Sequence, residues 1–298
     1  MLIGTTYSAR HAKHLGLPVA DSLRTATKWG FSHIRLGSYW SELETAPGKF
    51  NWKPLLAQLK ICESAKQPVV LTIGCKAPRW PEFYIPGWYA HLAADSAEFS
   101  VAIERFISAL MDVVIPFSCI THWQVENEPY LPVRIEGVWK KIPQSLVLLE
   151  LGLVRSMDAR PCILTAFGNH CVLDGSLTAL KSEADVIGID LYPKLFVRQV
   201  FGYLWYSGVL LGSLLPLTLG QCKQPIWITE LQAEPWERDD VGYRSKNPSS
   251  ISPKQLDQNL KLAQSLPVAE TLLWGFEYWI WLEQQGDDRY TKLVQSWL

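Results

Sequence analysis

Thr-His-Trp-Gln-Val-Glu-Asn-Glu-Pro, residues 121–129, joins an apolar-rich segment to a cluster of acids, an amide and a proline. The apolar-rich run from Phe117 to Val125 predicts a buried β-strand. Pro129 has no amide hydrogen with which to bond a neighbouring strand, so the strand is expected to end before it. Asn127 and Glu128 then lie at the carboxyl end of the strand, where parallel barrels and open α/β sheets hold their reactive groups.

A second stretch repeats this arrangement further along the chain. Residues 225–230 read Pro-Ile-Trp-Ile-Thr-Glu, so an apolar run again leads directly into a carboxylate. Hydrolysis of a glycosidic bond requires at least two carboxyl groups, and the two strand ends supply them. Glu128 and Glu230 are therefore the candidate catalytic residues.

Eight short apolar segments alternate with segments of helical length. We expect strands at Leu2–Thr6, in the first half of 31–40, and at 68–73, 117–125, 162–166, 185–190, 226–229 and 271–276. Helices are expected at 22–29, where Asp21 is the expected cap, and at 52–65, 96–114 and 145–157. This alternation predicts an α/β protein with a parallel sheet, and eight units in a chain of this length predict a (β/α)₈ TIM barrel. No break in composition marks a boundary, so a single domain is expected to span residues 1–298.

The composition argues against several classes of protein. The chain is 48% hydrophobic and 19% charged, which is typical of a globular protein and not of a disordered one. Its formal net charge is −1 and it has no basic stripe, which argues against a nucleic acid partner. Core packing accounts for most of the 14 tryptophans, but flat aromatic faces also stack on sugar rings, so this number favours a carbohydrate site.

The cysteine and histidine patterns indicate neither a metal site nor a cofactor. The six cysteines show no C-x-x-C spacing, and the six histidines form no H-x-H or H-E-x-x-H motif. Residues 1–8 have neither the basic start nor the long apolar core of a secretory signal, so a cytoplasmic location is expected. In that compartment the cysteines are expected to be free thiols.

The two glutamate motifs resemble those of the clan A glycoside hydrolases, the cellulase-like (β/α)₈ barrels that retain the configuration of the anomeric carbon. Asn127-Glu128-Pro129 is similar to the motif of the clan's fourth strand. This implies that Glu128 is the acid/base and that Asn127 binds the 2-hydroxyl of the substrate. Thr229-Glu230 is similar to the motif of the seventh strand, which implies that Glu230 is the nucleophile. The strand order of the whole chain fits this resemblance, which assigns no family within the clan.

The resemblance implies further site residues. Arg35 lies near the end of the second strand, where the clan has an arginine, and Tyr192 follows the sixth strand, where a tyrosine contacts the nucleophile. Trp279 follows the eighth strand and is similar to a sugar-stacking tryptophan, with Trp274 and Trp281 as alternatives.

One position departs from the clan. The third strand leads into Gly74-Cys75-Lys76, where many members of the clan have a histidine. This departure removes the basis for transferring a substrate from any one family of the clan to this chain.

A retaining mechanism requires one protonated carboxyl group and one carboxylate. Burial and the negative charge of Glu230 are expected to raise the pKa of Glu128 and to keep it protonated near neutral pH. Glu230 is expected to remain ionised beside Arg35 and to accept a hydrogen bond from Tyr192. The alternative is that both acids are ordinary surface glutamates at strand ends.

Other residues compete for places in the site. Glu126 is a rival of Glu128, because residues i and i+2 share one face of a strand. We favour Glu128, which lies nearer the strand end and follows an asparagine, and we expect Glu126 to be buried and hydrogen-bonded. Glu277 is either a further site acid or a carboxylate at a helix start. Trp40 and Trp80 are candidate substrate-binding residues that core packing could also explain.

Residues 199–219 contain no charged side chain and approach the length of a membrane span. They lie between the sixth and seventh strands, and a single crossing would split the barrel. Three glycines and Pro216 also argue against one straight helix. Two hypotheses remain: a buried helix with an oligomer contact, or a peripheral membrane-docking patch beside the site.

The sequence therefore predicts a retaining β-glycoside hydrolase that uses two glutamates and needs neither metal nor cofactor. One alternative is a non-catalytic carbohydrate-binding barrel with the same aromatic cleft. Another is a membrane-associated protein that acts on or binds lipid-linked glycosides. The motifs identify neither the sugar and its linkage, nor terminal against internal cleavage, nor the oligomeric state.

Overall fold

Eight parallel strands form a closed barrel in the computed structural model, as predicted. The structure describes residues 1–135, 138–168, 176–200, 203–207, 219–237 and 244–298. The barrel order is β1-β14-β13-β10-β9-β6-β5-β2, so the strands follow one another around the barrel in chain order and β1 closes it against β14. Their bounds are Leu2–Thr6 (β1), Ile34–Gly37 (β2), Val69–Ile73 (β5), Ile120–Val125 (β6), Cys162–Phe167 (β9), Val186–Leu191 (β10), Ile226–Gln232 (β13) and Glu270–Trp274 (β14).

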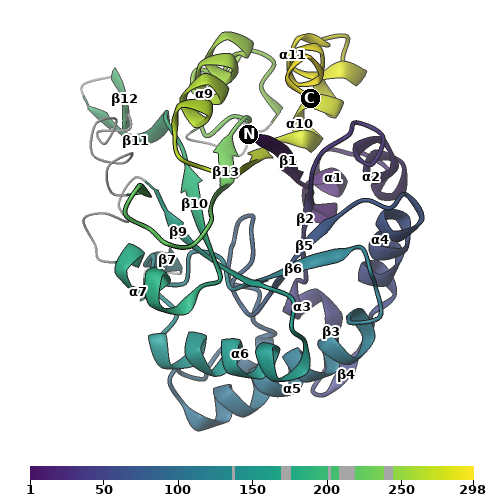
Figure 1. Cartoon of the computed structure of the whole chain (residues 1–298), viewed down its shortest axis with the longest axis vertical. Helices are drawn as coiled ribbons and strands as arrows, with labels where there is room; N and C mark the ends of the chain where they lie inside the picture. Colours follow the sequence, from purple (N-terminus) through teal and green to yellow (C-terminus); the bar gives the residue numbers. More distant parts are fainter. Residues whose placement is uncertain (136–137, 169–175, 201–202, 208–218, 238–243) are drawn as a thin grey trace.

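Helices surround the barrel on its outside (Figure 1). Their bounds are Ala9–His14 (α1), Val19–Ala26 (α2), Trp40–Leu43 (α3), Lys53–Ser64 (α4), Ala97–Val114 (α5), Gln144–Met157 (α6), Ser176–Glu183 (α7), Pro253–Ser265 (α9), Phe276–Gln284 (α10) and Arg289–Trp297 (α11). The longest of them, α5, begins where Ser96 accepts a hydrogen bond from the Phe99 amide, and it buries one apolar face against the core.

The barrel strands are continuous apolar runs because both of their faces are covered. Every residue of β5, β10, β13 and β14 is buried. A sheet with helices outside and side chains filling its interior leaves no polar face, so the strands show no apolar–polar alternation. This is why the sequence allowed all eight strands to be located.

Several predicted boundaries are wrong. Asp21 is not the cap of α2: the helix begins at Val19 after Pro18, which places Asp21 in the first turn. A carboxylate is favourable at either position, because both are near the positive end of the helix dipole. The last strand ends at Trp274, since Gly275 adopts a φ of 152° that favours glycine, and Phe276 already begins α10.

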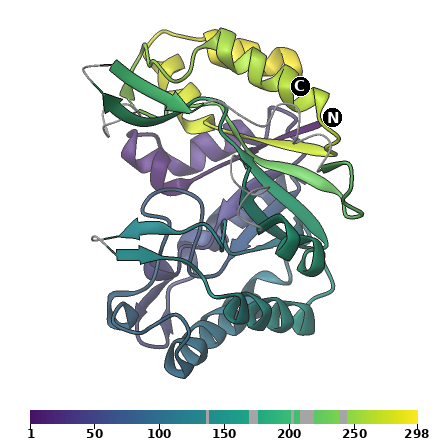
Figure 2. The same ribbon diagram turned by 90° about the vertical axis from the view of Figure 1, so that its left-hand side faces the viewer.

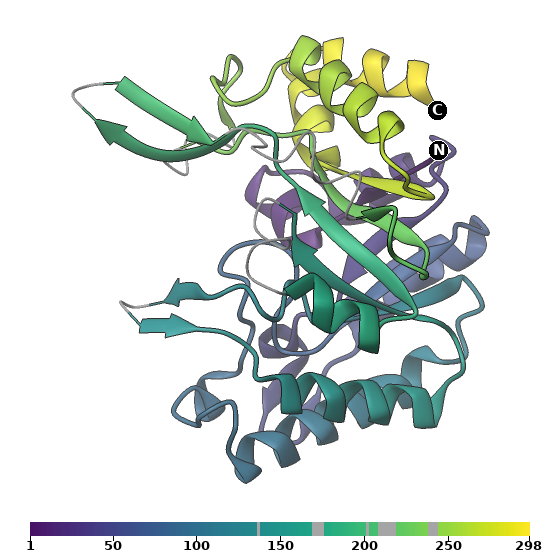
Figure 3. The same cartoon turned by 60° about the vertical axis from the view of Figure 1, so that its left-hand side comes forward.

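Two β-hairpins extend from the carboxyl ends of barrel strands. One consists of β7 (Val133–Ile135) and β8 (Val138–Lys140) and follows β6, and the other consists of β11 (Leu195–Val200) and β12 (Tyr203–Ser207) and follows β10. Both project from the same side of the molecule (Figures 2 and 3). A third, short hairpin of β3 (Glu44–Ala46) and β4 (Lys49–Phe50) follows α3.

The second hairpin corrects part of the interpretation of residues 199–219. The described residues up to Ser207 form strands and not a helix, in keeping with the aromatic and β-branched residues of this segment. Residues 208–218, on which the oligomer and membrane hypotheses also rest, lie outside the described part of the chain. Among the described helices, none is both long and apolar enough to cross a membrane.

Five cysteines of the described chain are free thiols, and Cys171 lies outside it. Cys62, Cys75, Cys119 and Cys162 are buried among the core side chains, where they act as small apolar groups.

Candidate active site

A cavity opens at the carboxyl ends of the barrel strands and contains both candidate catalytic glutamates. It is lined by Arg79, Trp80, Glu82, Asn127, Glu128, Leu131, Phe167, Tyr192, Glu230, Trp236 and Trp274. These side chains come from six of the barrel strands (β5, β6, β9, β10, β13 and β14) or from the loops that follow them. Barrels of this kind assemble their sites from this end of the sheet.

Glu230, in β13, accepts hydrogen bonds from Arg35 in β2 and from Tyr192, which directly follows β10. Arg35 Nη2 donates to Glu230 Oε1 at 2.5 Å, and the hydroxyl of Tyr192 donates to Glu230 Oε2 at 2.5 Å. Arg35 is fully buried, and its remaining donors bond Gln124 Oε1 at 3.1 Å and Thr6 Oγ1 at 3.0 Å. The guanidinium and the hydroxyl therefore bind both oxygens of the Glu230 side chain and fix its orientation.

Asp190 is a second buried carboxyl group close to Glu230 that the sequence analysis did not single out. It lies in register with Glu230 on the neighbouring strand β10, and it accepts a hydrogen bond from Thr229 Oγ1 at 2.6 Å. Burial raises the pKa of Asp190 well above its usual range, and the negative charge of Glu230 adds to the shift. This shift favours the protonated form of Asp190.

Glu128 lines the same cavity and is almost completely buried. Its amide donates to Thr165 Oγ1 at 2.7 Å, which fixes the backbone just beyond β6. Burial raises the pKa of Glu128 well above its usual range, and the nearby carboxyl of Asp190 contributes to the increase. The increase favours the protonated form that a general acid requires.

Glu126, the alternative to Glu128 as the catalytic residue, does not line the cavity. Its carboxylate accepts hydrogen bonds from the amides of Cys75 at 2.8 Å and Lys76 at 2.5 Å. The period of two does not apply, because β6 ends at Val125 and both glutamates have left-handed backbones, with φ of 59° and 43°. Glu126 is the buried, hydrogen-bonded residue that the sequence analysis expected.

Gly74 makes the position of Glu126 possible. A Cβ atom on Gly74 would lie 2.4 Å from Glu126 Oε1, and the glycine has a φ of 122°. Only glycine adopts this conformation without strain and leaves room for the carboxylate. Glycine at position 74 of the Gly74-Cys75-Lys76 segment is therefore explained by the structure.

Lys76, the last residue of the Gly74-Cys75-Lys76 segment, is a fully buried lysine beside Glu128. Its Nζ donates to the backbone carbonyl of Glu128 at 2.9 Å and forms an ion pair with Glu82 Oε2 at 3.1 Å. Its positive charge opposes the increase in the pKa of Glu128. Sequence analysis could not anticipate this role, because lysine is almost always exposed and only the fold shows that this one is not.

Arg79 organises a buried group of charges next to the cavity. It donates to both carboxylate oxygens of Glu234, with Nη2 to Oε2 at 3.1 Å, and to Glu277 Oε2 at 3.0 Å. Its guanidinium carbon lies 4.1 Å from the centroid of Trp274, over the ring. Glu277 is in the first turn of α10, accepts a hydrogen bond from the Ser8 amide and does not line the cavity. It is therefore a structural carboxylate at a helix start.

Glu277 makes the stability of the protein depend on pH. Burial raises the pKa of Glu277 from 4.5 to about 7, although Arg79 opposes the shift. The folded state then retains a proton that the unfolded state loses between these pH values, so folding stability falls as pH rises through this interval. The shift corresponds to about 3 kcal/mol in total, most of it between pH 5 and 7.5.

We expect the variant Glu277→Gln to lack this contribution. Urea unfolding of both proteins at pH 5 and 7.5 measures it, since the stability of the wild type relative to the variant should fall by about 2 kcal/mol between the two pH values. Parallel changes in both proteins would show that Glu277 does not titrate in this range.

The tryptophans of the cavity differ in part from those predicted. Trp80 and Trp274 line it, and so does Trp236, which the sequence analysis did not consider. The prediction that Trp279 stacks on a sugar is wrong. Trp279 lies within α10, is fully buried and donates from Nε1 to the Ala233 carbonyl at 2.6 Å. Because the helix starts directly after β14, Trp274 at the strand end takes the place proposed for Trp279.

The prediction that Trp40 binds the substrate is also wrong. Trp40 begins α3, is fully buried and packs between Tyr89 and Phe106, with ring centroids 5.4 and 5.3 Å away. Its Nε1 donates to Glu44 Oε2 at 2.5 Å. Trp40 therefore belongs to the core, as its alternative interpretation stated.

Asn127 lines the cavity, and a hydrogen bond from Gln124 orients its side chain. Gln124 Nε2 donates to Asn127 Oδ1 at 3.1 Å, which leaves the amide Nδ2 as a donor for a hydroxyl group of a ligand. Within the described ranges, no group of three or more His, Cys, Asp or Glu side chains is arranged to hold a metal ion.

Comparisons with known proteins identify the fold. No family model matches the chain, and a search of curated proteins finds no match. Among solved structures, a beta-galactosidase from the Antarctic haloarchaeon Halorubrum lacusprofundi superposes with a TM-score of 0.63 and 12% identity, over 92% of this chain and 52% of that one. The chain thus spans about half the length of the beta-galactosidases that it matches.

Two smaller enzymes match equally well. GH5_18 from Streptomyces cattleya in complex with GlcNAc gives a TM-score of 0.65 at 12% identity, over 92% of this chain and 70% of that one. GH5_18 from Bifidobacterium longum subsp. longum ATCC 55813 gives 0.64 at 14% identity, over 92% and 69%. All three are clan A glycoside hydrolases, the clan that the glutamate motifs resemble. At these identities the similarity establishes a common fold.

Proposed function

We propose that this protein is a retaining β-glycoside hydrolase that acts by double displacement, with Glu230 as nucleophile and Glu128 as acid/base. The observation that carries the proposal is the different environment of two carboxyl groups in one cavity. Glu230 accepts hydrogen bonds from Arg35 and Tyr192, and the guanidinium of Arg35 places a positive charge beside it. Burial raises the pKa of Glu128, which favours the protonated acid.

In the first step, the Glu230 carboxylate attacks the anomeric carbon as the bond from that carbon to the leaving oxygen breaks. Glu128 transfers its proton to the leaving oxygen, so the aglycone departs as a neutral alcohol. The sugar is then an ester of Glu230, with the configuration of the anomeric carbon inverted once.

In the second step, the Glu128 carboxylate takes a proton from water, whose oxygen attacks the anomeric carbon. The bond to Glu230 breaks, the configuration inverts again and the sugar leaves with its original configuration. Arg35 stabilises the carboxylate that Glu230 regains, and Glu128 returns to the protonated form.

The remaining cavity residues suit a sugar. Trp80, Trp236 and Trp274 offer flat apolar faces for a pyranose ring, and Asn127 Nδ2 offers a hydrogen-bond donor. We assign Asn127 to the 2-hydroxyl, as in the resemblance, because it directly precedes the acid/base. The reaction needs no metal or cofactor, since the two glutamates supply both the proton and the nucleophile.

A panel of aryl β-glycosides that differ in the sugar tests the proposal. We expect the wild type to release the phenol from at least one of them, and proton NMR of the early products should show the β-anomer first. The α-anomer as first product would contradict a retaining mechanism. Sugar binding without turnover of any glycoside would favour the non-catalytic carbohydrate-binding barrel.

A further inference from the structure

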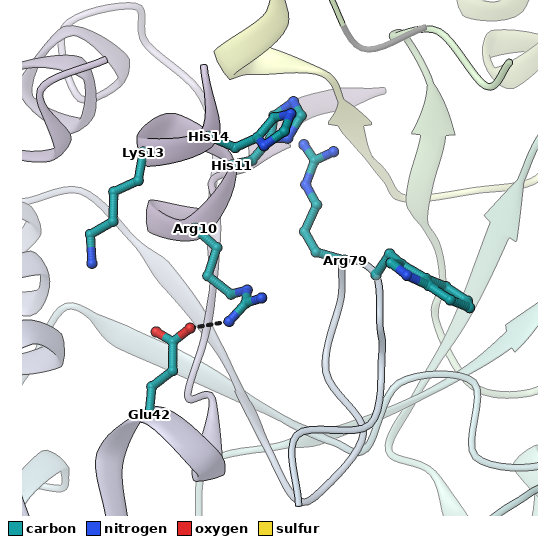
Figure 4. Close-up of a pocket in the computed structure, with 7 residues that line it drawn as sticks. Arg10, His11, Lys13, His14, Glu42 and Arg79 are labelled. Carbon is teal, nitrogen blue, oxygen red and sulfur yellow. Dashed lines mark hydrogen bonds and ion pairs between the residues drawn. The ribbon is translucent and has the colours of Figure 1, made fainter. Parts of the chain in front are cut away.

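A second cavity adjoins the proposed catalytic one. It is lined by Arg10, His11, Lys13, His14, Glu42, Arg79 and Trp80, and it shares Arg79 and Trp80 with the cavity of Glu128 and Glu230. Helix α1 supplies four of its side chains, and the loop after β5 supplies Arg79, which faces them across the space (Figure 4). The two cavities therefore meet at the side chains of Arg79 and Trp80.

The second cavity has an excess of positive charge. Arg10, Lys13 and Arg79 are cations, and Glu42 is the acid among the lining residues. Arg79 is balanced by Glu234 and Glu277 behind it. Lys13, in contrast, takes part in no ion pair with the residues that the structure describes, and its side chain is exposed.

Arg10 is oriented toward the cavity and only weakly neutralised. It forms an ion pair with Glu42 at the surface, where both side chains are more than one third exposed (Figure 4). Such exposed pairs contribute little to stability and open easily. The guanidinium of Arg10 also lies over the rings of Tyr84 and Tyr39, at 5.1 and 5.9 Å from their centroids, which restricts its orientation.

One of the two residues that the cavities share is an exposed aromatic side chain, Trp80. Trp80 is 63% exposed, although its neighbours Arg79 and Tyr84 are buried. An indole so exposed is a stacking surface for an apolar sugar face, as in other carbohydrate sites. A stacking surface close to Lys13, which has no ion pair among the described residues, and to the exposed Arg10–Glu42 pair favours a ring that carries a negative charge.

We propose that the second cavity is a subsite for an anionic sugar, which is a unit with a carboxylate, sulfate or phosphate group next to the unit cleaved between Glu128 and Glu230. This rests on the proposed function for the position of the cleaved bond. The sugar ring lies on Trp80, and its anionic group is bound by Lys13 and Arg10. The lysine supplies a mobile point charge with three donors, and the arginine supplies a planar pair of donors.

Binding of matched sugars tests this subsite independently of turnover. The probes are three pairs of sugars: glucuronic acid with glucose, galactose 6-sulfate with galactose, and mannose 6-phosphate with mannose. Binding is measured by the quenching of tryptophan fluorescence at low, equal ionic strength. We expect at least one anionic member to bind about tenfold more tightly than its neutral partner, the effect of one well-placed charge interaction. The preference should decrease as salt is added.

Charge reversal at Lys13 tests whether this residue produces the preference for anionic sugars. Lys13→Glu should reduce the preference at least about fivefold, whereas Lys13→Arg should retain it. Lys60→Glu is the matched control, because Lys60 lines a different surface cavity together with Arg24 and Lys28, away from the catalytic residues. It makes the same change in charge and should leave the preference unchanged.

Three results would overturn the subsite: equal binding of all anionic and neutral partners by the wild type, a preference that persists in Lys13→Glu, or binding of free phosphate or sulfate as tightly as of the sugar esters. Hydrolysis of neutral glycosides with any of these results would leave the proposed function intact. A charge preference that depends on Lys13, without hydrolysis of any substrate, would contradict the proposed function alone.

Discussion

Glu230→Gln is expected to reduce hydrolysis of the best aryl β-glycoside by at least about 10⁴-fold, because the variant has no carboxylate to attack the anomeric carbon. Glutamine keeps the size of the side chain and an oxygen that can accept from Arg35, which donates to Glu230 at 2.5 Å in the wild type. Initial rates at a saturating substrate concentration measure the loss.

Folding must be separated from catalysis in this experiment. Removing the partner of a fully buried arginine costs about 3–5 kcal/mol in comparable cases, so the assay temperature should lie below the unfolding midpoint of the variant. Glu283→Gln, an exposed position on α10, is the matched control and should retain full activity.

A small external nucleophile distinguishes a missing nucleophile from a distorted site. With Glu230→Ala, azide can enter the space left by the carboxylate and attack the anomeric carbon directly. The product should then be the α-glycosyl azide, since a single displacement inverts the configuration. Full activity of Glu230→Gln, or recovery with retained configuration, would contradict the role of Glu230.

Glu128→Gln is expected to give a loss that depends on the leaving group. A poor leaving group needs the proton of Glu128, so hydrolysis of alkyl or 4-methoxyphenyl glycosides should fall by about 10²–10⁴-fold. Formation of the glycosyl ester from a 2,4-dinitrophenyl glycoside needs no proton, and this step should remain nearly unchanged. Pre-steady-state release of the phenol measures the first step separately.

The pH dependence provides a second test of Glu128. Its pKa is raised by burial, so in the wild type the first step should lose activity as pH rises through that pKa and the acid becomes ionised. Glutamine cannot ionise, and the alkaline limb of the profile should disappear in the variant. Glu126→Gln serves as the comparison. Its carboxylate bonds the Cys75 and Lys76 amides, so any loss there should be the same for all leaving groups.

The barrel could be predicted from sequence because its strands are covered on both faces. Strands such as Val69–Ile73 and Ile226–Gln232 are entirely buried, and a fully buried strand appears as an uninterrupted apolar run. Strand boundaries were less certain, as Glu270–Trp274 shows, because the residue that ends a strand depends on local backbone geometry. At Gly275 that geometry is a φ of 152°.

The neighbours of the candidate site residues could be predicted only in part. The resemblance to the clan implied that Arg35 and Tyr192 lie beside Glu230, and the structure brings them into contact with it. The buried lysine at position 76 and the ion cluster of Arg79 were not expected. Arg79 and Glu277 are 198 residues apart in the chain, and no local pattern records such a contact.

The sequence by itself determined the barrel and the location of Glu128 and Glu230 at strand ends, because apolar runs and the residues that end them are local properties of the chain. Only the tertiary structure decided that Trp274 and not Trp279 faces the cavity, that Glu126 turns toward Gly74, and that the cations of α1 adjoin Trp80. The direction and partners of a side chain depend on backbone turns and on segments distant in the chain.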